Sequence, residues 1–100
     1  MIDLRYALSS KTLGEDFDII SGDTREMEAY HKKRLLFFTL IPKINGGFDL
    51  ACNCVEDLNL PDHGPNPKID LIIPLDYWVS RGIPVNQAAV IAAKIMLASY

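Results

Sequence analysis

The amino-acid sequence predicts an α+β domain in which a small, mainly antiparallel sheet carries two principal helices, over about 23–40 and 84–99. Three observations lead to this fold class. Short apolar–polar alternations are typical of half-buried strands, an Asp23-x-x-Glu26 box precedes a helix-like spacing of apolar residues, and the final stretch is apolar around most of a helical wheel. One hundred residues suffice for one core, so residues 1–100 are expected to form a single globular domain.

Alternating apolar residues predict several short strands. The last of them contains Pro74, which places it at a sheet edge or breaks it, and a short helix over 75–81 closed by Gly82 is the alternative there. The turn residues Asn45, Gly46 and Gly47 indicate a hairpin. The predicted strands cover residues 2–8, 17–20, 48–52 and 69–77.

The first principal helix is predicted from its start signal and its spacing. Asp23 can cap the free backbone amides, and Glu26 completes a capping box. The residues that follow at i, i+3, i+4 and i+7 are Met27, Tyr30, His31, Arg34, Phe37, Phe38 and Ile41. A buried strand over 35–41 fits the same residues, because periodicity alone does not separate the two structures in a short apolar run.

The terminal helix gives the main functional expectation. Its first apolar face is ordinary core, but a second face, offset by about half a turn, also needs cover. We expect this second face to contact a second copy of the chain, since a twofold dimer is the commonest way to bury it. The alternative is a central helix, between the sheet and the helix over 23–40. The interface candidates are Ala89, Val90, Ala93 and Leu97.

Composition and motifs give little support for catalysis or metal binding. The Cys52-x-Cys54 pair has one residue between its cysteines, whereas zinc sites usually have two to four, and the pair fits two small hydrophobes on a half-buried strand. No nucleophile elbow, phosphate loop or metalloprotease motif occurs. We therefore expect no catalytic residue, no metal and no cofactor. The alternative is a small enzyme or ligand-binding fold with its site near His63 and Cys52.

One junction carries a local resemblance. Residues 78–84, Trp-Val-Ser-Arg-Gly-Ile-Pro, resemble the end of the recognition helix in small phage Cro-like helix-turn-helix repressors. That resemblance implies a DNA-associated regulator in which the residues before Trp78 face the major groove. The candidate ligand or DNA contacts are His63, Trp78 and Arg81. A helix–Gly–Pro–helix junction without a DNA role explains the same residues.

Charge and composition limit which partners and which cellular location we expect. The net charge of −3 and the sequence pI of about 5.2 disfavour a nucleic-acid surface. No apolar run reaches the roughly 20 residues of a membrane span, and two closely spaced cysteines fit a reducing cytoplasm. The expected function is a small, non-enzymatic cytoplasmic interaction or adaptor protein that acts through a surface, with itself or another protein as its partner.

Overall fold

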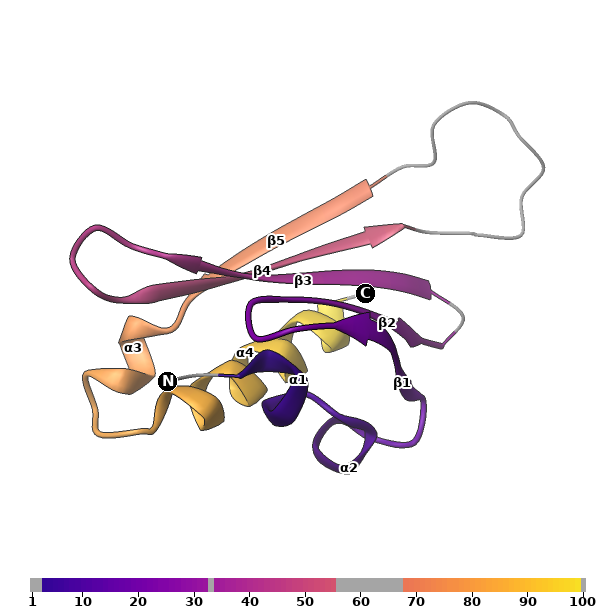
Figure 1. Cartoon of the computed structure of the whole chain (residues 1–100), viewed down its shortest axis with the longest axis horizontal. Helices are drawn as coiled ribbons and strands as arrows, with labels where there is room; N and C mark the ends of the chain where they lie inside the picture. The colour runs from indigo at the N-terminus through magenta and orange to yellow at the C-terminus, as the bar shows by residue number, and fades with distance from the viewer. Residues whose placement is uncertain (1–2, 33, 56–67, 100) are drawn as a thin grey trace.

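The computed structural model describes residues 3–32, 34–55 and 68–99, which form an α+β fold with one antiparallel sheet (Figure 1). The strands are β1 (Phe17–Gly22), β2 (Glu26–His31), β3 (Arg34–Pro42), β4 (Phe48–Val55) and β5 (Lys68–Pro74). The helices are α1 (Leu4–Ala7), α2 (Ser10–Leu13), α3 (Asp76–Val79) and α4 (Val85–Ser99).

The five strands pair in sequence order, β1-β2-β3-β4-β5, and each pair is antiparallel. The hairpin predicted at residues 45–47 joins β3 to β4. There Gly46 has a φ of 92°, which favours glycine, and the Asn45 side chain accepts a hydrogen bond of 3.2 Å from the Gly47 amide. The alternation predicted over 48–52 and most of that over 69–77 are confirmed as β4 and β5.

The predicted helix over 23–40 is wrong, because those residues form the β2–β3 hairpin instead. The start signal serves a turn: the Asp23 carboxylate accepts hydrogen bonds from the amides of Arg25 and Glu26, at 2.9 and 3.1 Å, where β1 turns into β2. The second turn depends on Lys32, which has a φ of 51°. The strand that was the alternative over 35–41 is confirmed.

The predicted strand over 2–8 is also wrong. Its described part forms the single turn of α1, where the Asp3 side chain accepts a hydrogen bond from the Tyr6 amide, and α2 follows directly. Leu4, Ala7 and Leu8 are buried, at the i, i+3 and i+4 spacing of a helix. The strand predicted at 17–20 is confirmed as part of β1.

Helix α4 lies along the sheet and packs against it mainly through small side chains. Ala88, Ala92 and Met96 are completely buried, so the helix backbone approaches the strands closely. The short helices α1 and α2 pack against α4 on this same side of the sheet, and α3 packs at its beginning (Figure 1). The sheet side of the core consists of Phe17, Met27, Ala29, Leu36, Phe38, Leu40, Leu50, Cys52 and Cys54.

Candidate interaction surface

The two faces of the sheet differ in their cover. Burial alternates along β3, where Leu36, Phe38 and Leu40 are buried against the helices while their neighbours on the strand are half-buried or exposed. No described helix lies on the second face, which we name the uncovered face. Among the residues whose side chains the structure describes, the strand register assigns to it Asp18, Ser21, Glu26, Glu28, Tyr30, Leu35, Phe37, Thr39, Ile41, Asp49, Ala51, Asn53, Ile72 and Pro74. The backbone register adds Val55, Asp70 and Lys68.

Apolar side chains cross the middle of the uncovered face. Phe37 lies between Glu28 of β2 and Asn53 of β4, and Ala51 lies between Thr39 of β3 and Ile72 of β5. Ile72 is 60% exposed, and Tyr30, Ile41 and the neighbouring Ile20 are exposed as well. Scattered exposed apolar residues are ordinary, but adjacent ones on one flat face are typical of a contact surface.

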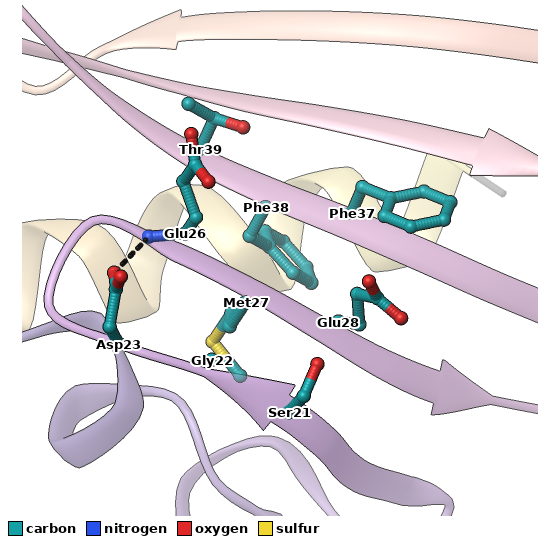
Figure 2. Close-up of a pocket in the computed structure, with 9 residues that line it drawn as sticks. All are labelled: Ser21, Gly22, Asp23, Glu26, Met27, Glu28, Phe37, Phe38 and Thr39. Atoms are coloured by element: carbon teal, nitrogen blue, oxygen red, sulfur yellow. Dashed lines mark hydrogen bonds between the residues drawn. The ribbon is translucent and has the colours of Figure 1, made fainter.

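A hollow of about 310 Å³ opens at one corner of the uncovered face (Figure 2). In Figure 2, Glu26 lies beside Thr39 and Glu28 lies beside Phe37, matching their register across β2 and β3. Two carboxylates, an aromatic ring and a hydroxyl therefore lie on neighbouring strands. The full lining is Ser21, Gly22, Asp23, Glu26, Met27, Glu28, Phe37, Phe38 and Thr39.

Local backbone features shape this corner. The register between β1 and β2 shifts between Ile19 and Ser21, which bulges β1 where it borders the hollow. Gly22 packs so closely on Met27 that an added Cβ would overlap the Met27 side chain. The Asp23 carboxylate already accepts two backbone hydrogen bonds, which lower its pKa from the usual value. Glu26 and Glu28 thus remain as the hollow's two uncommitted carboxylates.

Charge on the uncovered face is negative. Among the described side chains, Glu26 and Glu28 make no ion pair. Lys43 is occupied at the far end of β3, where its Nζ lies 2.9 Å from Asp49 and 2.8 Å from Asp76. Hydrogen bonds to these two carboxylates raise the pKa of Lys43 and tie the β3–β4 hairpin to the start of α3.

The interface candidates on α4 lie mostly inside this chain. Ala89 and Ala93 are completely buried, while Val90 and Leu97 are partly buried against the same core. The cover on the second face of α4 comes from α1 and α2, and not from the helix expected over 23–40. The prediction that a second copy binds this face stays untested. Its main reason, an apolar helix face without cover, is largely removed.

A smaller hollow of about 170 Å³ remains between these helices. It is lined by side chains of α1, α2 and the beginning of α4, including Val90 and Asn86. The Asn86 Oδ1 atom is buried without a hydrogen-bond partner among the described groups. The second face of α4 is therefore covered except at this small gap.

The remaining predicted contact residues do not meet in one place. Cys52 is completely buried under the sheet, and His63 lies outside the described residues. Trp78 is half-buried in α3, and the Arg81 guanidinium lies 3.7 Å from the centre of the Tyr77 ring and donates to the Tyr77 carbonyl. The segment that would form the supporting helix, residues 61–67, lies outside the described residues, and β5 extends to Pro74, where the resemblance needs the recognition helix.

The described residues contain no group of three His, Cys, Asp or Glu side chains arranged to hold a metal ion. None of the helices in these segments has the length and hydropathy needed to cross a bilayer. No family model, curated protein or solved structure matches the chain significantly.

Sequence reasoning missed the uncovered face because it placed Phe37 and Phe38 together on one side of a helix. A signal was present: Leu35, Phe37, Thr39 and Ile41 alternate with Leu36, Phe38 and Leu40. A strand with apolar residues in both sets needs contact on both faces, just as the two-sided α4 helix does.

Proposed function

We propose that this protein is a small, non-enzymatic binding module that contacts another polypeptide through the uncovered face of its sheet. The observation that carries the proposal is the apolar row, the set of half-buried and exposed apolar side chains on β3 and β5, opposite a face that three helices cover. Contact with a partner removes this apolar area from water, which contributes roughly 25 cal/mol per Å². A cytoplasmic location, expected from composition, belongs to the same proposal.

The proposal names a different contact surface from the one expected from the sequence. The functional class, a non-enzymatic interaction protein, stays the same. The expected surface was the second face of α4, where Ala89 and Ala93 are now accounted for by this chain's own packing. The uncovered face spans all five strands of the sheet. Both a second copy and a different protein remain partners that an experiment can separate.

Site-directed photo-crosslinking in cells that naturally express the protein tests the proposal. A photoreactive phenylalanine analogue replaces Ile72 on the uncovered face or, as a matched control, Ile44 in the β3–β4 turn, which is fully exposed and lies away from the face. We expect protein adducts from position 72 that are absent from position 44. Equal labelling at both positions, or none, contradicts the proposal.

The mass of the adduct identifies the kind of partner. A product at twice the 11.2 kDa of the chain indicates a second copy, and any other mass indicates a different protein. Sedimentation velocity of the purified wild type over a range of concentrations then shows whether self-association occurs without other components.

A further inference from the structure

We infer that the uncovered face docks a polypeptide segment carrying both cationic and apolar side chains, contributed by a different protein. This inference rests on the proposed function, because it names the chemistry of the partner at the same surface. The apolar row supplies area for contact, and the charges beside it decide which partner fits.

The described charges on this face favour a cationic partner. Asp18, Glu26 and Glu28 belong to the face, and its fourth described carboxylate, Asp49, is paired with Lys43. Among the side chains that the structure describes, the exposed cations lie elsewhere, on the short helices, in turns and on α4: Arg5, Lys11, Arg25, Lys32, Arg81 and Lys94. The register also places Lys68 and Asp70 of β5 on this face, one charge of each sign. Arg25 neighbours Glu26 in sequence but forms no ion pair with it in this structure.

A second copy stacked about an axis centred on β3 places no cation over Glu26 and Glu28. When two sheets stack face to face about a twofold axis centred on β3, β2 lies over either β2 or β4 of the second copy. In the first arrangement Glu26 and Glu28 meet identical carboxylates. In the second they meet Asp49, Ala51 and Asn53, none of which is a cation. Either stack buries unpaired negative charge, which opposes association because the carboxylates lose their hydration without gaining a cationic partner.

The hollow gives a cationic side chain a defined place. Glu26 and Glu28 are two residues apart on β2, so their backbone positions are separated by roughly 6.6 Å. A lysine or arginine between them pairs with either carboxylate, and an arginine can make two parallel hydrogen bonds. The Phe37 ring next to Glu28 adds an aromatic surface on which a cation is stabilised. Apolar neighbours in the segment then reach Leu35, Ala51 and Ile72.

Selection from a random peptide library on the immobilised full chain tests this inference. Recovered peptides are measured by fluorescence anisotropy against wild type and against the Glu26→Gln/Glu28→Gln variant. The control, Glu15→Gln/Asp16→Asn, removes two exposed carboxylates in the loop before β1. We expect peptides rich in Lys or Arg beside apolar residues, with affinity reduced about tenfold by the first variant and unchanged by the control.

The outcomes separate this inference from the proposed function. An Ile72→Thr variant weakens any peptide bound on the apolar row. Peptides that respond to Ile72→Thr but not to the glutamate variant overturn the cationic inference and support the binding face. Peptides that respond to neither variant overturn both. Failure to recover any peptide overturns the inference, while the crosslinking experiment still decides the proposed function.

Discussion

The two faces of strand β3 contain similar residues and have different roles. Leu36 and Phe38 are at most 1% exposed, whereas Leu35 and Phe37 are only half-buried one position away on the same strand. The difference comes from the helices, since α4 and the two short helices suffice to cover one face only (Figure 1). Equal apolar content therefore supports folding on one side of this sheet and leaves the other side available for contact.

The largest expected effect separates the two phenylalanines. Phe38→Ala removes a ring that packs 6.0 Å from Phe17, centre to centre, and is expected to lower the free energy of unfolding by about 3–5 kcal/mol. Phe37→Ala is expected to cost about 1 kcal/mol, because this ring is only partly removed from water. Urea denaturation followed by circular dichroism measures both. Similar losses would show that the uncovered face is buried by something in the isolated protein.

A second contrast tests the close packing of α4. Ala93→Leu inserts three carbon atoms at a completely buried position and is expected to cost about 1–3 kcal/mol. Ala98→Leu changes an exposed position on the same helix and is expected to leave stability within about 0.5 kcal/mol. Thermal denaturation compares the two. A well-folded Ala93→Leu protein with unchanged stability would restore this face as a candidate interface.

A smaller effect concerns pH on the covered face. Burial lowers the pKa of His31 below its usual 6.5, the charges of Lys32 and Arg34 act in the same direction, and Asp16 opposes them. The folded protein thus binds fewer protons than the unfolded chain, so the stability that depends on the neutral ring is full above pH 6.5. It is lost as the pH falls through 6.5 and then through the lowered pKa.

Urea denaturation at about pH 7 and about pH 5 measures this loss. The matched control is His31→Gln, which carries no titrating ring and is expected to show the smaller change in stability between the two conditions. An equal pH dependence in the two proteins would assign the effect to other groups. NMR titration of the His31 ring gives its pKa directly.

The smallest effect is expected at Ile72. This residue lies on the uncovered face, and Ile72→Thr keeps a β-branched side chain in the edge strand β5. Stability is expected to change by no more than about 0.5 kcal/mol. Thermal denaturation checks this value. A larger loss would mean that the variant reports on folding as well as on binding.

Several elements of this fold were readable from the sequence. The terminal helix, the β3–β4 turn and the alternation of β4 each carry a local signal that agrees with the final structure. Each alternative at Pro74 is confirmed in part, since the strand β5 ends at Pro74 and not at Tyr77, and the helix α3 covers Asp76–Val79 within the predicted 75–81. These segments could be predicted because their signals are local: turn chemistry, helix periodicity and proline each act within a few residues.

The segment over 23–40 shows where local signals fail. Asp23 and Glu26 fit a helix start and equally fit a turn, because in both the Asp23 carboxylate accepts from the amides that follow. Between Met27 and Phe38 the apolar residues fit both the i, i+3, i+4 spacing of a helix and the alternation of a strand. The strand was selected by pairing with β1 and β4, which are contributed by other parts of the chain. The candidate binding face could not be predicted while this segment was assigned to a helix.

The sequence by itself determined the fold class and a terminal helix that needs cover on two sides, because both follow from apolar patterning within short windows. Only the tertiary structure decided what covers that helix: α1 and α2 pack on α4, Ala89 and Ala93 are completely buried within this chain, and α4 in turn covers one face of the sheet. The surface left for a partner is therefore on β1 to β5. The physical reason is that burial depends on which segments meet in space, whereas periodicity shows only that a face must be buried.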